Sequence, residues 1–157
     1  MTKKATFGAG CFWGVEEVFR TLNGVVSTCV GYIGGNLKNP NYKDVCTDKT
    51  GHAEAVEITF NPDKITYKKL LEVFWANHNP TTFNRQGPDE GAQYRSAIFY
   101  HDSEQKESAE KMLKEFNKSG KFKKPIVTQI MVASEFFKAE EYHQKYLFKK
   151  GKPSCSA

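Results

Sequence analysis

The sequence predicts an α+β fold, a ferredoxin-like two-layer sandwich in which helices pack against an antiparallel sheet. The first six periodic segments follow the order β-α-β-β-α-β, which is the split βαβ arrangement of that fold. A further helix, a strand and a short helix follow before a mobile tail. The chain has 157 residues, of which 39% are hydrophobic and 13% aromatic, enough for one domain with its own core. We therefore expect a single domain over residues 1–157.

The first three elements flank a glycine-rich junction. Residues 3–7 form a short strand, and residues 12–21 carry apolar side chains at three- and four-residue spacing, which indicates an amphipathic helix. A second strand is expected over residues 25–30. The glycines that begin at Gly31 predict a turn-rich loop, which continues without a clear period to Gly51.

The middle of the chain adds two strands and a helix. Residues 52–60 alternate between two faces, as a half-buried strand does. Residues 66–77 place their large apolar side chains on one helical face, with Thr66 as the expected N-cap. A second long polar loop over residues 79–91 separates this helix from a strand expected over residues 94–100.

Three further elements follow. Asp102 is the expected N-cap of a helix over residues 103–118, and Gly120 ends that helix. A strand is expected over residues 126–132, and a shorter amphipathic helix over residues 138–147. Three side chains of the shorter helix would face the core: Tyr142, Tyr146 and Leu147.

The charge balance argues against a nucleic-acid-binding protein. Lysine and arginine outnumber aspartate and glutamate by 23 to 18, which gives a net charge of +5. Much of the excess lies in residues 118–124 and in the tail, and a nucleic-acid interface would need aromatic side chains interleaved on one face. No apolar run approaches the roughly 20 residues that span a bilayer, and the start of the chain lacks an apolar signal core. We expect a cytoplasmic monomer with no membrane partner.

The four cysteines stand apart, at positions 11, 29, 46 and 155, and none forms a CxxC pair. This spacing argues against a structural zinc site. A disulfide framework is unusual in a cytosolic domain that can build its own core. Redox or nucleophilic chemistry is therefore expected for at least some of these thiols.

Cys11 is the strongest candidate for a reactive thiol. It lies between the first strand and the first helix, where unpaired backbone N–H groups and the helix dipole favour a thiolate. Gly10 and Gly14 allow a ligand to approach the backbone closely, and Phe12 and Trp13 can wall an apolar pocket beside the sulfur. The alternative is a buried structural thiol, but the glycine-rich junction favours a reactive one.

Glu54 is the candidate acid. Strand alternation puts it on the same face as Val56, Ile58 and Phe60. Burial without a cation would raise the pKa of its carboxyl and make it a general acid near neutral pH. The alternative is that Glu54 lies just beyond the core edge, in water, and the pattern alone leaves both readings open.

The tail, residues 148–157, is rich in polar residues, glycine and proline, so we expect it to be flexible. It carries Cys155. A reactive cysteine that is oxidised to sulfenic acid needs a second thiol to regenerate it, and a mobile Cys155 can reach Cys11 and form a disulfide. The alternative is an incidental surface thiol.

Six segments resemble, in the family's order, the peptide methionine sulfoxide reductase A family. The pentapeptide GCFWG and the block GHAEAV are together highly specific for it. The segments are Gly10–Gly14, Gly31–Gly35, Asn39–Tyr42, Gly51–Val56, Phe74–His78 and Gln93–Ser96.

The resemblance implies a role for each matched residue. Cys11 matches the catalytic nucleophile, and Glu54 matches the acid that protonates the sulfoxide oxygen, which favours the buried reading of Glu54. The remaining matches are Phe12 and Trp13, which hold the substrate methyl group; Tyr42 and Tyr94, which donate hydroxyl hydrogen bonds to the oxygen; and Asp89, an acidic site residue.

The resemblance also implies an activity: reduction of the S epimer of methionine sulfoxide, free or in proteins, through a sulfenic acid and an intramolecular disulfide. Thioredoxin is the implied reductant, dithiothreitol an artificial one, and no metal or bound cofactor is implied. Many family members carry two tail cysteines, whereas this chain has only Cys155 there, so the Cys11–Cys155 disulfide would pass directly to thioredoxin. Cys46 matches another family cysteine and is a second candidate resolver, whereas Cys29 is expected to be buried and inert.

Two other functions compete with this one. A peroxide-reducing thiol enzyme would reduce hydrogen peroxide and leave methionine sulfoxide unchanged. A binding module for oxidised methionine or thiols would bind without turnover under any reductant. The combination of Cys11, Glu54 and two tyrosines argues against the module.

Overall fold

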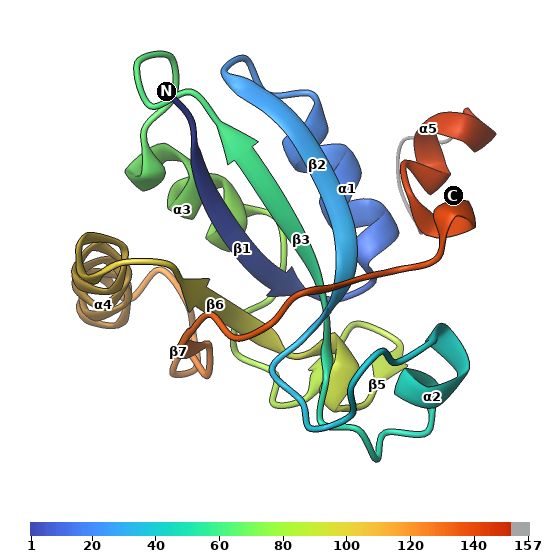
Figure 1. The fold of residues 1–157 in the computed structure, drawn as a ribbon. Helices are drawn as coiled ribbons and strands as arrows, with labels where there is room; N and C mark the ends of the chain where they lie inside the picture. The colour runs from blue at the N-terminus through green and yellow to red at the C-terminus, as the bar shows by residue number, and fades with distance from the viewer. Residues whose placement is uncertain (152–157) are drawn as a thin grey trace.

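The computed structural model describes residues 1–151. Figure 1 shows a twisted sheet with helices packed behind it and a chain segment crossing its front. The six strands of the sheet are β1 (Lys3–Ala9), β2 (Val25–Ile33), β3 (Ala53–Phe60), β6 (Ser96–Tyr100), β7 (Gln129–Val132) and β8 (Phe137–Lys138). The helices are α1 (Phe12–Arg20), α2 (Tyr42–Cys46), α3 (Tyr67–Ala76), α4 (Ser103–Ser119) and α5 (Tyr146–Lys150). A small hairpin, β4 (Arg85–Gln86) and β5 (Asp89–Glu90), and the 3-10 turns η1 (Ala92–Tyr94) and η2 (Glu141–His143) complete the described chain.

The predicted ferredoxin-like core is confirmed. The sheet order is β7-β6-β1-β3-β2-β8, and the four central strands are β6, β1, β3 and β2. Each neighbouring pair among these four is antiparallel. Helix α1 connects β1 to β2 and α3 follows β3, so the chain has the split βαβ connections that the sequence predicts.

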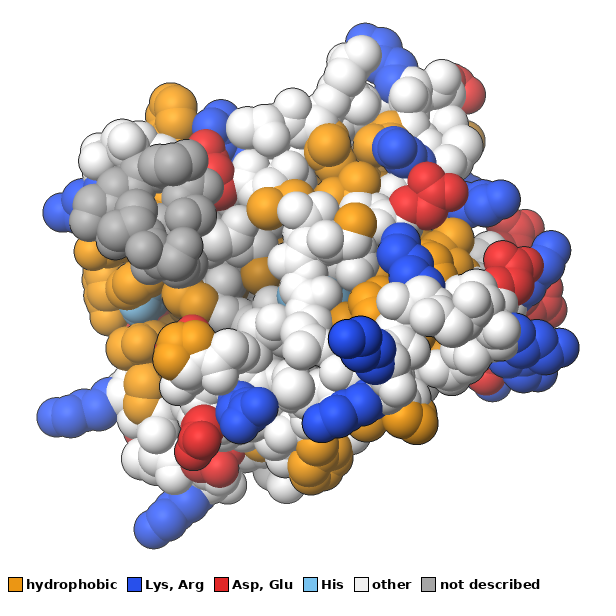
Figure 2. All heavy atoms as spheres, turned by 180° about the vertical axis from the view of Figure 1, so that it is seen from behind, with side chains coloured by type: hydrophobic (Ala, Val, Ile, Leu, Met, Phe, Trp, Pro, Cys, Tyr) orange, Lys and Arg blue, Asp and Glu red, His pale blue; other side chains and the backbone are white. Residues whose placement is uncertain are grey.

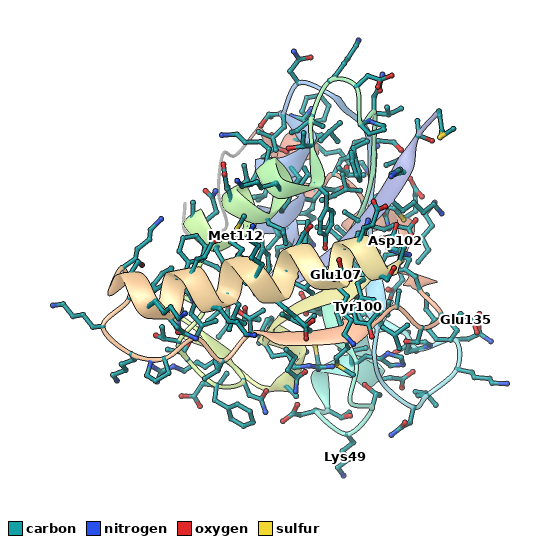
Figure 3. The ribbon with its side chains drawn as sticks, turned by 90° about the vertical axis from the view of Figure 1, so that its left-hand side faces the viewer. Lys49, Tyr100, Asp102, Glu107, Met112 and Glu135 are labelled. Atoms are coloured by element: carbon teal, nitrogen blue, oxygen red, sulfur yellow. The ribbon has the colours of Figure 1, made fainter. Side chains whose placement is uncertain are left out.

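We had expected a wholly antiparallel sheet, but one pair of its strands is parallel. Strand β7 pairs with β6 in parallel, with Ile98 opposite Ile130. The reason is helix α4, which returns the chain to the starting end of β6 before β7 begins, because parallel neighbours need such a crossover. In Figure 3, α4 runs from Asp102 across the face turned to the viewer, and Met112 lies on the side toward α3.

The expected loop after residue 30 was placed too early. Strand β2 continues to Ile33. Residues Gly31–Ile33 pair with β3 on one side, and Gly31 and Tyr32 pair with β8 on the other. The rest of this segment contains the short helix α2. Asn41 caps it, accepting a hydrogen bond from the Asp44 backbone N–H, while Asp44 accepts one from the Asn41 backbone. This local capping box gives a short helix to a segment that has no apolar period.

The prediction of a helix over residues 138–147 is wrong. Strand β8, turn η2 and helix α5 occupy this stretch, and Tyr142 is 57% exposed where we had expected it to face the core. The backbone N–H of Lys145 donates to Glu16 Oε1 at 2.6 Å, and Lys145 has a φ of +50°, which a continuous helix does not allow. Leu147 is buried as predicted.

Helix α5 also bears on the expected tail. It extends through Lys150, so residues 148–150 are helical. Cys155 lies outside the described residues, and the division into one domain and a tail stays a prediction.

The main core lies between the sheet and helices α1, α3 and α4. The Phe7 ring, on the central strand β1, has its centroid 5.4 Å from that of Phe19 and 4.9 Å from that of Phe74. A smaller apolar cluster covers the opposite face, where the segment between β7 and β8 crosses the sheet (Figure 1). Its members are Ile33, Ala53, Ala55, Ala97, Phe99, Ala133 and Phe136. Burial of both faces accounts for the nearly continuous burial along β3.

The surface agrees with the reading of the charges as solvated. Figure 2 shows lysine and arginine side chains scattered singly or in small groups over one face of the molecule. Among the described residues, no helix has both the length and the apolar character that crossing a membrane requires.

A buried chain of hydrogen bonds joins α3 to the sheet edge. Trp75 Nε1 donates to Thr128 Oγ1 at 3.1 Å, the Thr128 and Ser96 hydroxyls lie 2.7 Å apart, and Ser96 Oγ lies 2.7 Å from His78 Nε2. His78 Nδ1 lies 2.6 Å from the carbonyl oxygen of Phe74, which can only accept, so Nδ1 carries the proton. Every group in the chain is satisfied when His78 is neutral, and burial lowers the pKa of His78 to about 4.

This histidine should make stability sensitive to acid. The unfolded chain takes up a proton near pH 6.5 and the folded chain only near pH 4, so stability from His78 is lost as the pH falls between these values. The wild type and His78→Gln share all other titrating groups, so the contributions of those groups to the pH dependence of stability cancel when the two are compared. The free energy of unfolding of each protein is measured with urea. Between pH 7 and pH 5, that of the wild type should fall by about 2 kcal/mol more than that of the variant. A difference that is constant over this range would contradict the assignment.

Candidate active site

Cys11 lies at the start of α1, where β1 ends. Gly10 turns the chain with a φ of +102°, and a Cβ atom at that position would lie 2.8 Å from Gln86 Cγ, so the junction requires glycine. Cys11 is the N-cap of α1, and its side chain makes no capping hydrogen bond. Its carbonyl accepts the first helical hydrogen bond, from Val15 at 3.4 Å. The structure thus places Cys11, half-exposed, at the helix amino terminus, as the sequence predicts.

Glu54 is buried, with 1% of its surface exposed, which decides between the two readings of the sequence. Its Oε1 accepts a hydrogen bond from the backbone N–H of Phe12 at 3.3 Å, and its Oε2 accepts one from Gln93 Nε2 at 3.0 Å. Burial, with a smaller contribution from the charge of Asp89, raises the pKa of Glu54 to about 7, although the hydrogen bonds from Gln93 and Phe12 oppose the rise. Near neutral pH the carboxyl is therefore divided between its acid and carboxylate forms, so a protonated acid is available against the Cys11–Phe12 peptide.

Two phenols complete the polar side of the site. Tyr42 is the first residue of α2, whereas we had expected it to lie in a loop. Tyr94 is the last residue of η1. Burial raises the pKa of both above the ordinary range; contacts with Cys46 add to this for Tyr42, and the charges of Glu54 and Asp89 add to it for Tyr94. Both hydroxyl groups therefore stay protonated near Glu54 and can donate hydrogen bonds.

An aromatic cluster forms the apolar side. The Trp13 ring stacks on Tyr146, with centroids 3.9 Å apart, and its Nε1 donates to His143 Nδ1 at 2.9 Å. Phe12 is 1% exposed, and its ring lies 5.1 Å from that of His143, which in turn lies 4.6 Å from that of Tyr42. The Trp13 indole is thus fixed on two sides by residues from the last described elements.

Comparison with known proteins identifies the chemistry of this arrangement. A family model described as peptide methionine sulfoxide reductase matches residues 3–157.

The chain belongs to the peptide methionine sulfoxide reductase family.

Relatives of known name and structure agree with this membership. The peptide methionine sulfoxide reductase MsrA of Methanothermobacter thermautotrophicus is 60% identical over 153 residues, which are 98% of this chain and 90% of that protein. The crystal structure of Mxr1 from Saccharomyces cerevisiae in reduced form superposes with a TM-score of 0.88 at 38% identity, over 96% of this chain and 86% of that one. Mxr1 in complex with Trx2 gives a TM-score of 0.65 at 26% identity, over 92% and 84%. The protein is therefore an oxidoreductase of the methionine sulfoxide reductase class.

Three residues of this reductase site were missed by sequence reasoning. Gln93 is 4% exposed and contacts Glu54, although the sequence indicated no role for it beyond its place in the matched segment Gln93–Ser96. Glu140 accepts hydrogen bonds from the Tyr32 hydroxyl and the Tyr42 backbone N–H, both at 2.9 Å. His143 is 1% exposed, and its Nδ1 accepts from Trp13, so its proton is on Nε2. The latter two come from the stretch that we had expected to be a helix, and no local signal marks them.

The described cysteines other than Cys11 differ in their surroundings. Cys46 is exposed at the end of α2, and its Sγ lies 3.6 Å from Gln93 Nε2, the same nitrogen that contacts Glu54. Cys29 lies half-buried on β2, less buried than we had expected, and burial raises the pKa of its thiol. That Cys29 is inert stays a prediction. Within residues 1–151, no group of three or more His, Cys, Asp and Glu side chains is arranged to hold a metal ion.

Proposed function

We propose that this reductase converts the S epimer of methionine sulfoxide, free or within proteins, to methionine, with Cys11 as nucleophile and Glu54 as general acid. One observation carries the proposal. A buried carboxyl with a pKa of about 7 is hydrogen-bonded to the backbone N–H of the residue that follows the cysteine. An acid so placed can give its proton to an oxygen atom bonded to the sulfur that Cys11 attacks.

The reaction transfers one oxygen atom. The Cys11 thiolate attacks the sulfoxide sulfur, and the sulfoxide oxygen takes the proton of Glu54. The oxygen ends on Cys11 as sulfenic acid, and the substrate leaves as methionine, so the sulfoxide is reduced by two electrons and Cys11 is oxidised by two. The amino terminus of α1 stabilises the thiolate that starts the reaction.

The tyrosines and aromatics position the substrate in this scheme. Tyr42 and Tyr94 donate hydrogen bonds to the sulfoxide oxygen, where negative charge develops before proton transfer. Phe12 and Trp13 hold the methyl group, since contacts between sulfur-bound groups and aromatic rings are favourable. Asp89 helps to keep Glu54 protonated, because its charge raises the pKa of that carboxyl. The methyl group and the oxygen cannot exchange places between an apolar wall and a set of donors, which selects one epimer.

Recycling in this proposal uses Cys155. Its thiolate attacks the sulfenic sulfur of Cys11, water leaves, and a Cys11–Cys155 disulfide forms. Thioredoxin then reduces the disulfide by thiol exchange, and dithiothreitol can replace it in the test tube. The structure of the relative Mxr1 in complex with Trx2 supports such a partner. Since the cycle needs a supply of reduced thioredoxin, we place the enzyme, as a monomer, in the reducing cytoplasm.

Turnover of separated epimers tests the proposal. We expect reduction of the S epimer alone, driven by thioredoxin or dithiothreitol, and no comparable reduction of hydrogen peroxide. Cys155→Ser should lose thioredoxin-driven turnover by at least about tenfold and keep turnover with dithiothreitol, because a small dithiol can attack the sulfenic acid directly.

Cys46→Ser is the matched control, and it should keep both activities. If Cys46→Ser loses thioredoxin-driven turnover and Cys155→Ser does not, then Cys46 is the resolving thiol. Turnover of the R epimer, or of neither epimer, would contradict the proposed function.

A further inference from the structure

Gln93 is a neutral polar side chain that donates a hydrogen bond to the Glu54 carboxyl. It lies in η1, between the β4–β5 hairpin and β6, and is 4% exposed. Its Nε2 lies 3.0 Å from Glu54 Oε2 and 3.6 Å from Cys46 Sγ. Both N–H groups of the amide thus have an acceptor, which fixes the amide with its nitrogen, and not its oxygen, toward Glu54.

The two oxygens of Glu54 are held differently. Oε2 accepts the shorter hydrogen bond, 3.0 Å from the Gln93 amide, and Oε1 the longer, 3.3 Å from the Phe12 backbone N–H. A neutral carboxylic acid has one carbonyl oxygen, which is the better acceptor, and one hydroxyl oxygen, which is the donor. The shorter bond favours Oε2 as the carbonyl oxygen. The acidic proton is then on Oε1, the oxygen against the Cys11–Phe12 peptide.

We propose that Gln93 is a positioning residue for the reductase reaction: its amide occupies Oε2 of Glu54 and so keeps the acidic proton on Oε1, beside Cys11. This inference rests on the proposed function, since it concerns the proton that Glu54 delivers. Without Gln93, the neutral acid could turn its O–H toward either side, and part of the population would hold the proton away from the substrate.

Other groups around Glu54 do not provide this orientation. Asp89, on β5, repels the Glu54 carboxylate and is not among its hydrogen-bond partners. Burial raises the pKa values of Tyr32 on β2, Tyr42 on α2 and Tyr94 on η1, and the charge of Glu54 adds to this, so all three stay protonated over the range in which Glu54 titrates. Gln93 carries no charge, so its effect acts through the hydrogen bond and does not itself depend on pH.

The test replaces Gln93 by methionine, which has a similar length and no N–H donor. Gln105→Met is the matched control. Gln105 is also 4% exposed, but it donates to the carbonyl oxygen of Lys4 and accepts from the backbone of His101, at the start of α4. Two measurements are made on the full chain of each variant. The first is the ¹³C NMR titration of the Glu54 carboxyl carbon, and the second is the pH dependence of kcat/KM for S-methionine sulfoxide with dithiothreitol.

We expect Gln93→Met to raise the pKa of Glu54 by about one pH unit, because the amide stabilises the carboxylate. At pH 5.5, where Glu54 is protonated in both proteins, kcat/KM should still fall by about tenfold, because the proton is no longer confined to Oε1. The pKa of the alkaline limb of the kcat/KM profile should rise by the same amount as the pKa of Glu54 measured by NMR. Gln105→Met should shift neither the titration nor the profile, whatever it does to stability.

Two results would overturn the proposal. An unchanged kcat/KM at pH 5.5, whether or not the titration shifts, would show that Gln93 does not orient the acid. A lowered pKa in Gln93→Met would mean that the amide oxygen accepts the acidic proton at Oε2. Failure of the proposed function is distinguishable from both: the titration would shift upward as expected, while the wild type reduced no sulfoxide.

Discussion

Cys11→Ser is expected to abolish turnover of methionine sulfoxide, by at least about 10⁴-fold, while leaving the fold intact. Serine has no accessible anion near neutral pH and cannot hold the oxygen as sulfenic acid. Cys11 is the N-cap of α1 and makes no side-chain capping hydrogen bond, whereas serine is among the best capping residues. The variant should therefore be as stable as the wild type, so that lost activity is not lost structure.

Single-turnover mass spectrometry measures this effect directly. The pre-reduced wild type should gain one oxygen atom on Cys11, or the disulfide that follows, for each methionine formed. Cys29→Ser is the matched control, because the Cys29 thiol is half-buried on β2 and its pKa is raised by burial. It should keep activity within about twofold. Residual turnover by Cys11→Ser above about a hundredth of the wild-type rate would contradict the nucleophile assignment.

Glu54→Gln is expected to lower kcat/KM by about 10²- to 10⁴-fold, because it removes the transferable proton and keeps the shape of the side chain. The pH profile gives a second signature. The acid form of Glu54 is needed, and its pKa is about 7, so wild-type single turnover should decline above about pH 7. The variant should lack this limb, because glutamine does not titrate in this range.

The matched control for Glu54→Gln lies three residues along the same strand. Glu57 occupies the other face of β3 and pairs with Lys4 at 3.3 Å. Glu57→Gln should keep both the rate and the alkaline limb. If Glu54→Gln retained the limb near pH 7, another group would be the acid.

The sequence predicted what local pattern encodes. The order of the first strands and helices, the position of Cys11 near the amino terminus of a helix and the apolar face that holds Glu54 all follow from periods of two and 3.6 residues and from glycines. These features were confirmed because each depends on a few neighbouring residues. The burial of Glu54 was left open by the pattern, and its position opposite Tyr32 within the sheet decides it.

What the sequence did not predict depends on distant partners. The stretch from Lys138 to Leu147 has a helical period, but Glu16 and Val30 bind its backbone and side chains and prevent a helix there. The Gln144 side chain accepts a hydrogen bond from the backbone N–H of Val30 on β2 and donates one to the Val30 carbonyl oxygen. No local period reveals this role. Gln93 was missed for the same reason, since no period in the neighbouring residues marks a contact with Glu54.

The way in which Trp13 is held has a consequence for folding kinetics. Its hydrogen bond to His143 joins residues 130 apart in the chain, and the contact between Phe12 and Glu54 joins residues 42 apart. Contacts of such long sequence separation form slowly, because the entropy of closing large loops is lost before the contacts stabilise the chain. The pocket should therefore assemble late during refolding, and recovery of activity should lag behind the formation of helical signal.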